Sequence, residues 1–178
     1  MATTLAHDAD HFTAQTSQRE QAPSERAPLI HLSAVIAWGT YIAGLSLAVA
    51  TTPGMLFDLV QGGAGPIALG GSFGAFMLLI AMIQRHMGTA LTENKTLTPP
   101  RLCTSGIFKY SRNPIYLAFI LPISALAIYS IAAAAVTVAC YVVATTLFVI
   151  RGEETFLREK FGADYVDYLH NTPRWLIV

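Results

Sequence analysis

Long apolar runs alternate with polar segments along most of the chain. The first run covers residues 29–51 and the second covers residues 66–84, and neither contains Asp, Glu, Lys or Arg. A helix rises about 1.5 Å per residue, so roughly 20 apolar residues cross a hydrocarbon core about 30 Å thick. Each of these two runs therefore predicts one membrane-spanning helix.

A third apolar stretch is too long for a single crossing, because it stays apolar for 37 residues from Pro114 onward. One straight helix of that length would overshoot the bilayer. Two shorter helices, covering about 114–129 and 131–151 and joined by a tight turn near residues 129–130, fit better. The chain is therefore expected to be all-α, an integral membrane bundle of four transmembrane helices.

Polar segments flank this predicted bundle. Residues 1–28 are rich in charge and predict a disordered tail, which leaves residues 29–178 as the membrane domain. Residues 152–178 have an amphipathic pattern, which is typical of helices that lie at the membrane interface or fold back under a bundle. Gly162 is expected to divide this segment into two helices, since glycine ends helices readily.

The positive charges are sorted to one side of the predicted bundle. With four spans, the tail, the loop of residues 85–113 and the C-terminal segment share a side, and all eleven Lys and Arg residues fall there. The positive-inside rule then places both termini in the cytoplasm. A three-span or five-span arrangement would break this partition, which favours four.

Composition limits the other functional classes. The chain is 53% hydrophobic and only 12% charged, about half the charged fraction of a soluble domain. Its formal net charge is zero, so it has no basic excess for binding nucleic acid. His86 and His170 are far apart in sequence and have no cysteine partner, so no metal site is expected.

The loop of residues 85–113 and the helix start after it carry most of the candidate chemistry. A loop this long between membrane helices is more often functional than idle. Gly106 lets the backbone approach a ligand closely, and Phe108 and Tyr116 offer ring faces to a flat base or a cation. Arg112 can hold a carboxylate, although arginine beside a membrane helix is also common without any such role.

Two adjacent glutamates follow the last predicted span. Glu154 has Arg151 three residues before it and Arg158 four residues after it, so local ion pairs explain it without a function. Glu153 has apolar neighbours four residues away on either side, so its carboxylate needs a partner from elsewhere, either Arg112 or a bound cation. A functional role is therefore favoured more for Glu153 than for Glu154.

Together these segments resemble the isoprenylcysteine carboxyl methyltransferase family, whose wider superfamily includes membrane phospholipid N-methyltransferases. The motifs that carry the resemblance are residues 104–108, 111–117, 153–154 and 161–165. Their combination is specific, whereas each motif alone would be weak. The resemblance covers about residues 85–175, which is roughly half of the chain.

The resemblance implies S-adenosylmethionine as the cofactor, bound in a pocket at the cytoplasmic side, and a lipidic or prenylated methyl acceptor reached from the membrane lipid. By motif position, the implied cofactor-binding residues are Pro100, Arg101, Leu102, Cys103, Gly106, Phe108, Asn113, Pro114, Ile115, Tyr116 and Glu153. The implied catalytic or acceptor-facing residues are Arg112, Arg151, Glu153 and Glu154.

The sequence departs from the family at two of these positions. Asn113 stands where eukaryotic members carry His, and an amide does not titrate near neutral pH, which argues against a base there. Phe108 stands where many members have Tyr, so the ring is kept and a hydroxyl is lost. A proton from a thiol or amine acceptor would then pass to Glu153 or Glu154, whereas a carboxylate acceptor needs no base.

Three functions follow from this pattern. The leading one is methyl transfer from S-adenosylmethionine to an apolar or prenylated carboxylate or thiol, with lipid amines and quinone-like or terpenoid acids as further candidates. The second is a non-catalytic subunit that keeps the fold and packs against a membrane protein partner; binding of S-adenosylmethionine separates the two. The third, a relative of NADPH-dependent membrane reductases, is disfavoured because no further basic cluster for a 2′-phosphate is evident.

Overall fold

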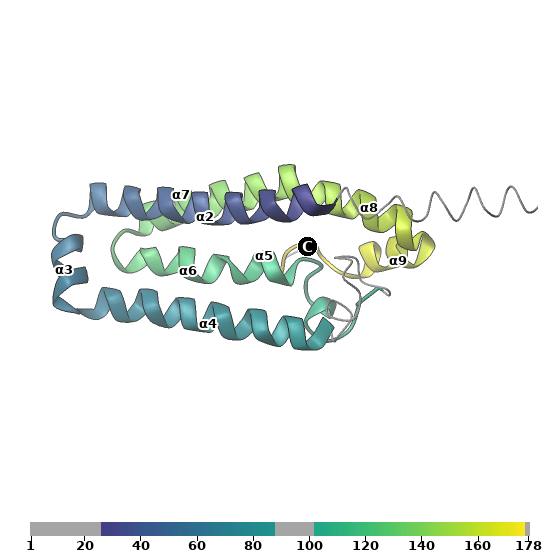
Figure 1. The fold of residues 1–178 in the computed structure, drawn as a ribbon, viewed down its shortest axis with the longest axis horizontal. Helices are drawn as coiled ribbons and strands as arrows, with labels where there is room; N and C mark the ends of the chain where they lie inside the picture. The colour runs from purple at the N-terminus through teal and green to yellow at the C-terminus, as the bar shows by residue number, and fades with distance from the viewer. Residues whose placement is uncertain (1–25, 88–101, 177–178) are drawn as a thin grey trace, which may run out of the picture.

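The computed structural model describes residues 26–87 and 102–176, which are almost entirely helical (Figure 1). The predicted all-α class is confirmed for these ranges, and no strand occurs within them. The predicted tail of residues 1–28 lies outside the described residues, except that the first described helix already begins at Arg26.

The first two predicted spans match helices that are a few residues longer than expected. They are α2 (Arg26–Thr51) and α4 (Ala64–Met87). The last span is α7 (Ile131–Thr145), which continues through a π-helical turn, η4 (Thr146–Ile150), into α8 (Arg151–Phe161). Among the described residues, three stretches are long and apolar enough to cross a membrane: Leu32–Thr51, Ala64–Met87 and Ile131–Phe161.

The helix expected over residues 114–129 ends at Ile128 and is built from several pieces. These are α5 (Pro114–Ala118), α6 (Ile120–Ser124) and the 3₁₀ turn η3 (Ala125–Ile128). Together they form an apolar stretch, Pro114–Ile128, that is shorter than the three long ones. The part of the chain that the structure describes thus contains three full-length candidate spans and one short one, and four membrane crossings stay a prediction.

The tight turn predicted near residues 129–130 is confirmed. Helix η3 ends at Ile128 and α7 begins at Ile131, with Ser130 between them in an extended conformation. The Ser130 hydroxyl oxygen accepts a hydrogen bond from the amide of Ala133 at 3.2 Å, which satisfies a free N–H at the start of α7. The Ser130 cap therefore starts α7 after the turn, although the turn contains neither glycine nor proline.

The helices run side by side along the long axis of the molecule (Figure 1). Helix α2 packs mainly against α7, whereas α4 packs against α5 and α6. One end of the bundle carries α3 (Met55–Gln61), which lies between the first two predicted spans. Gly54 and Gly62 flank it with φ of 93° and 74°, a region that favours glycine. The other end gathers the segment that begins at residue 102, α8 and α9 (Ala163–Asn171).

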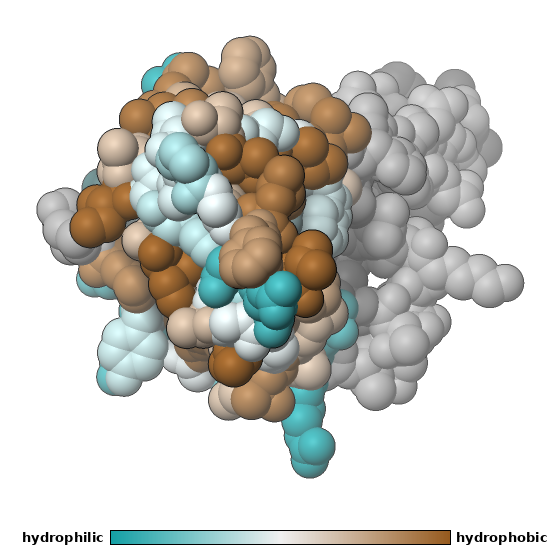
Figure 2. Space-filling model, turned by 90° about the vertical axis from the view of Figure 1, so that its left-hand side faces the viewer, coloured by the Kyte–Doolittle hydropathy of each residue, from teal (hydrophilic) through white to brown (hydrophobic). Residues whose placement is uncertain are grey.

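The outer surface of the helices is apolar, as expected where lipid is the solvent. Large hydrophobic side chains point outward from the long helices, among them Val35, Ile42, Ile67 and Leu78. Seen from the α3 end, only a few strongly hydrophilic residues interrupt this surface (Figure 2). A soluble monomer rarely exposes apolar patches of this extent, so the surface agrees with a membrane protein.

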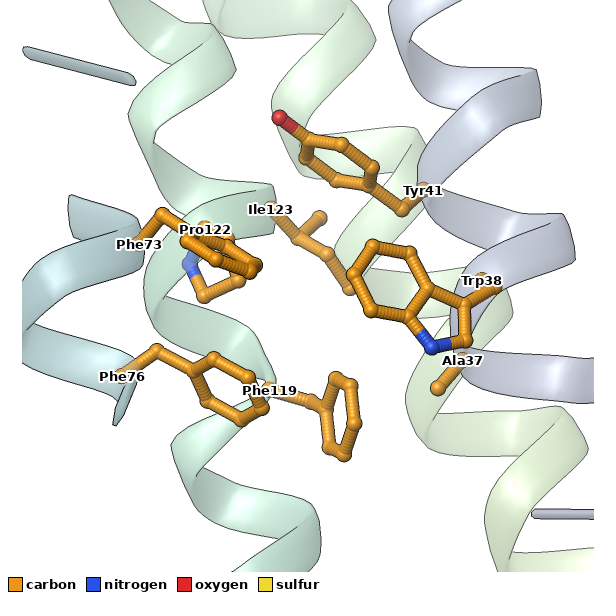
Figure 3. Close-up of a pocket in the computed structure, with 8 residues that line it drawn as sticks. All are labelled: Ala37, Trp38, Tyr41, Phe73, Phe76, Phe119, Pro122 and Ile123. Carbon is orange, nitrogen blue, oxygen red and sulfur yellow. The ribbon is translucent and has the colours of Figure 1, made fainter. Parts of the chain in front are cut away.

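Aromatic rings fill the space where α2, α4 and α6 approach one another (Figure 3). The rings of Phe76 and Phe119 lie 4.5 Å apart between centroids, and Trp38 meets Phe119 edge-on at 6.4 Å. A narrow crevice remains between these rings, lined by Ala37, Trp38, Tyr41, Phe73, Phe76, Phe119, Pro122 and Ile123. Phe119 links this crevice to a larger cavity at the end of the bundle.

Candidate active site

A cavity of about 390 Å³ lies where the helical bundle meets the C-terminal helices. This volume falls within the range of roughly 300–1,000 Å³ that is usual for small-molecule sites. Ten of the residues predicted from the sequence line it: Leu102, Cys103, Phe108, Arg112, Asn113, Pro114, Ile115, Tyr116, Glu153 and Glu154. The structure thus brings together the loop, the start of α5 and the start of α8.

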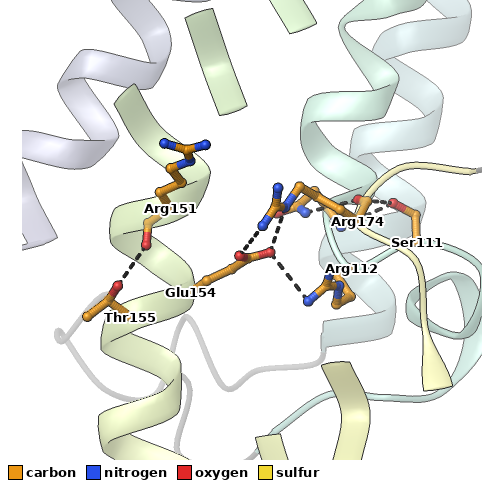
Figure 4. A network of polar contacts seen from close by, with 7 residues as sticks. Ser111, Arg112, Arg151, Glu154, Thr155 and Arg174 are labelled. Carbon is orange, nitrogen blue, oxygen red and sulfur yellow. Dashed lines mark hydrogen bonds and ion pairs between the residues drawn. The ribbon is translucent and has the colours of Figure 1, made fainter. Parts of the chain in front are cut away.

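Two predicted residues within the described ranges, Gly106 and Arg151, are not part of this lining. Pro100 and Arg101 lie outside the described residues, so their roles stay predictions. Gly106 has φ 62°, and a Cβ there would overlap the ring of His86, so its small size serves a turn rather than the cavity. Arg151 is exposed, and its side chain lies apart from the charged cluster at Glu154 (Figure 4).

The loop before α5 is fastened to α4 and α9. The 3₁₀ turn η2 (Gly106–Lys109) buries Phe108 against Phe76 and Ile83 of α4. The hydroxyl of Tyr168 donates to the Phe108 carbonyl at 2.7 Å. These contacts fix the backbone of one cavity wall, which is the requirement for a site that orients a ligand.

Glu153 accepts a hydrogen bond from a tyrosine, a partner that the sequence did not indicate, while Arg112 pairs with Glu154. A bound cation as a partner of Glu153 stays a prediction. The Tyr116 hydroxyl on α5 donates to Glu153 Oε1 on α8 at 3.0 Å. The Tyr116 carbonyl in turn accepts from the hydroxyl of Tyr141 on α7 at 3.0 Å. Three helices thus position this carboxylate at the cavity.

Glu154 forms a three-residue charged cluster with two arginines that are distant in sequence (Figure 4). Arg174 donates from Nε to Oε1 at 2.9 Å and from Nη2 to Oε2 at 2.6 Å, while Arg112 Nη1 lies 3.4 Å from Oε1. The local ion pairs expected with Arg151 and Arg158 are thus replaced, within the described residues, by long-range pairs. Sequence reasoning missed Arg174, because nothing in its local pattern indicates a partner in α8.

The two glutamates both line the cavity although they are consecutive in sequence. They lie in the first turn of α8, directly after the π-helical turn η4. A π-helical turn inserts an extra residue into a helix and is frequent at functional sites. The buried Val149 and Ile150 anchor this turn, so the direction of both carboxylates is set by packing.

Two tyrosines of α9, Tyr165 and Tyr168, also line the cavity and were not predicted as site residues. Burial raises the pKa of Tyr165 to about 12, with the Glu154 carboxylate adding to the effect. Burial also raises the pKa of Tyr168. Both phenols therefore stay protonated near neutral pH, where they donate hydrogen bonds and offer ring faces rather than act as bases.

The fold and the site together define a helical membrane protein whose aromatic cavity holds two carboxylates and a guanidinium. The chain belongs to the phospholipid methyltransferase family, whose sequence profile matches residues 67–164. This match indicates a membrane methyltransferase and supports the wider superfamily that the motifs implied, while the isoprenylcysteine group within it stays a prediction. No curated protein and no solved structure matches the chain.

Proposed function

We propose that this chain transfers the methyl group of S-adenosylmethionine to an apolar or prenylated acceptor at the cytoplasmic face of the membrane. The acceptor group in this proposal is a carboxylate or a thiol. One observation carries the proposal: Arg112, Glu153 and Glu154 meet in a largely apolar, aromatic cavity at one end of a membrane bundle. Membership of a methyltransferase family supports the reaction class.

The lining suits the chemical groups of this cofactor. S-adenosylmethionine carries a flat base, a cationic sulfonium that supplies an activated methyl group, and an amino acid end. The Glu153 carboxylate suits a cation, and the rings of Phe108 and Tyr165 suit either a cation or a base. The Arg112 guanidinium suits a carboxylate, from the cofactor or from the acceptor.

The membrane side of the cavity supports an acceptor with a hydrocarbon part. Ser33 and Ala34 of α2 line the cavity, one turn before Ala37 and Trp38 of the aromatic crevice. Phe119 lines both spaces. An acceptor can therefore place its polar group near Glu153 while its apolar tail lies along the membrane helices, where burial of each CH₂ contributes about 0.8 kcal/mol.

The transfer itself needs position more than acid–base chemistry. The acceptor oxygen or sulfur forms a bond to the methyl carbon while the carbon–sulfur bond of the sulfonium breaks, and the bonding electrons stay on that sulfur. A carboxylate acceptor loses no proton, whereas a thiol first gives its proton to a base. Glu153 is the residue proposed for that role, because Tyr116 holds it at the cavity.

The proposed orientation places both termini in the cytoplasm. The start of α2, the segment that begins at residue 102, α8 and α9 lie at one end of the bundle (Figure 1). All eleven Lys and Arg residues fall outside the turns at the α3 end, a distribution that the positive-inside rule associates with the cytoplasmic side.

Methyl transfer from labelled S-adenosylmethionine tests the proposal. Membranes containing the protein should produce a labelled lipidic product that matched membranes without it do not. With a thiol acceptor, Glu153→Ala should reduce labelling at least about 100-fold, the scale of a lost positioned acid–base group. With a carboxylate acceptor, the reduction should be about tenfold at subsaturating S-adenosylmethionine, through weaker cofactor binding. Glu159→Ala, an exposed glutamate on the same helix, is the matched control and should keep its activity.

The labelled product identifies the acceptor class. A base-labile methyl ester indicates a carboxylate acceptor, a methyl thioether indicates a thiol, and an N-methylated phospholipid would replace the proposed acceptor by a lipid amine. Full activity of Glu153→Ala would contradict the role of that residue. The absence of any labelled product would instead favour a non-catalytic subunit.

A further inference from the structure

A short C-terminal segment, residues 172–175, lies across the start of α5. The amide of Arg112 donates to the Pro173 carbonyl at 3.0 Å. The Arg174 carbonyl accepts from the Ser111 hydroxyl at 3.1 Å and from the Asn113 side-chain amide at 3.0 Å. Trp175 then packs against the buried cluster of Ala37, Ile123 and Tyr141. These backbone and side-chain contacts together fix the position of the Arg174 backbone.

From that anchored backbone, Arg174 holds Glu154 through both carboxylate oxygens. Its two hydrogen bonds of 2.9 and 2.6 Å form the parallel fork that only a guanidinium provides. Hydrogen bonding to Glu154 also raises the pKa of Arg174. Arg174 itself lies outside the cavity lining, and the cavity residue that its side chain contacts is Glu154.

Arg112 is the weaker partner of the same carboxylate. Its Nη1 is 3.4 Å from Glu154 Oε1, and its Nε is buried without a hydrogen-bond partner among residues 26–87 and 102–176. The Arg112 side chain is 12% exposed and lines the cavity. A buried guanidinium with incomplete hydrogen bonding binds an additional anionic oxygen well, because that oxygen supplies both charge and acceptors.

We propose that Arg174 is a positioning residue that holds Glu154 in a bidentate pair and thereby leaves Arg112 to receive an anionic oxygen of the methyl acceptor. The inference rests on the proposed function, since it assigns the acceptor of that same site an anionic group. The group is a carboxylate or a phosphate. Without Arg174, Glu154 closes onto Arg112, neutralises it and competes with the acceptor.

Steady-state methyl transfer with two probes tests this arrangement. The carboxylate probe is N-acetyl-S-farnesylcysteine, which represents the proposed acceptor. The phosphate probe is phosphatidylethanolamine in phosphatidylcholine vesicles, whose methylation would replace that acceptor by a lipid amine beside an anionic phosphate. On whichever probe the wild-type protein methylates, Arg174→Gln should raise the KM for the acceptor about tenfold and change kcat less than about threefold. The KM of Arg174→Lys should lie between those of the wild type and Arg174→Gln, because an ammonium keeps the charge but not the bidentate geometry.

A second substitution distinguishes positioning from a merely structural role. Adding Glu154→Gln to Arg174→Gln removes the competing carboxylate, so the KM should return to within about threefold of wild type. Arg158→Gln, an exposed arginine one turn along α8, is the matched control and should leave KM unchanged. A double variant that binds the acceptor no better than Arg174→Gln alone overturns the proposal.

Thermal unfolding supplies a readout that does not depend on activity. Arg112→Gln should lower the Tm more in the Arg174→Gln background than in the wild-type background, because Arg112 is then the remaining partner of Glu154. Equal decreases in the two backgrounds would overturn the claim that Arg174 holds Glu154 away from Arg112. A wild-type protein inactive on both probes counts against the proposed function, and the thermal comparison then decides the role of Arg174 alone.

Discussion

The two ends of the bundle use polar residues in opposite ways. At the α3 end, the Tyr129 hydroxyl donates to Asp58 Oδ2 at 2.6 Å, and the Thr52 hydroxyl donates to the Tyr129 carbonyl at 3.1 Å. The outward residues around this pair are apolar, and they include Leu56, Phe57 and Val60. At the cavity end, Glu153 and Glu154 are held by residues from other segments and still line an open space.

This difference separates a structural polar contact from a candidate site. A Cβ at Gly65 would overlap both Asp58 and Tyr129, so the α3 end is packed closely around its polar pair. Such packing ties α3 and α4 to the turn before α7. The cavity end has a volume of about 390 Å³ beside its carboxylates, so these charged groups can contact a ligand.

The largest predicted effect is at the cavity end. Glu154→Ala removes the shared counter-charge of Arg112 and Arg174, leaving two guanidinium groups close together in a mostly buried setting. The free energy of unfolding should fall by about 2–3 kcal/mol, less than the 3–5 kcal/mol for a fully buried pair because Arg174 is partly exposed. Thermal or denaturant unfolding in detergent, with Glu159→Ala as the control, measures it. If the free energy of unfolding fell by less than about 0.5 kcal/mol, the claim that Glu154 stabilises the fold through Arg112 and Arg174 would be contradicted.

A smaller effect is expected from Tyr116→Phe, which removes a single hydroxyl from the cavity. The hydrogen bond to Glu153 is lost while the ring and its packing stay. A hydrogen bond to a charged group contributes about 1.5–3 kcal/mol, so methyl transfer should fall roughly tenfold or more. Tyr110→Phe is the control, because Tyr110 is an exposed tyrosine of the loop before α5. Equal activity of the two variants would contradict a role for the Tyr116 hydroxyl in the site.

The smallest effect is expected at the α3 end. Asp58→Asn keeps the shape of the side chain and weakens its bond with Tyr129, so stability should fall by about 1 kcal/mol. Methyl transfer should stay within about twofold of wild type, because the residue lies at the opposite end of the bundle from the cavity. A tenfold loss of kcat/KM in a folded variant would show that the two ends are coupled.

Patterns local in sequence predicted much of the fold. The apolar runs located α2, α4 and α7, and the length of the third run located the turn that Ser130 caps. Gly162 separates α8 from α9 as expected, with φ 54°. These features follow from helix length, hydrophobicity and backbone freedom, each of which acts over a few neighbouring residues.

Features that depend on contacts between distant residues could not be predicted. The pairing of Glu154 with Arg174 requires knowledge of where the chain after α9 lies, and Arg158 was an equally plausible partner by spacing alone. Tyr165 fits an amphipathic pattern whether its ring faces lipid or a cavity. The π-helical turn before α8 has no compositional signature, although it sets the direction of both glutamates.

Equilibrium binding of S-adenosylmethionine to the purified protein in detergent tests the central claim most directly. We predict saturable binding at one site by the wild-type protein, weakened at least about tenfold by Glu153→Ala and unchanged by Asp58→Asn. Binding that is absent in the folded wild-type protein, or equally strong in both variants, would contradict the assignment of the cavity as the cofactor site.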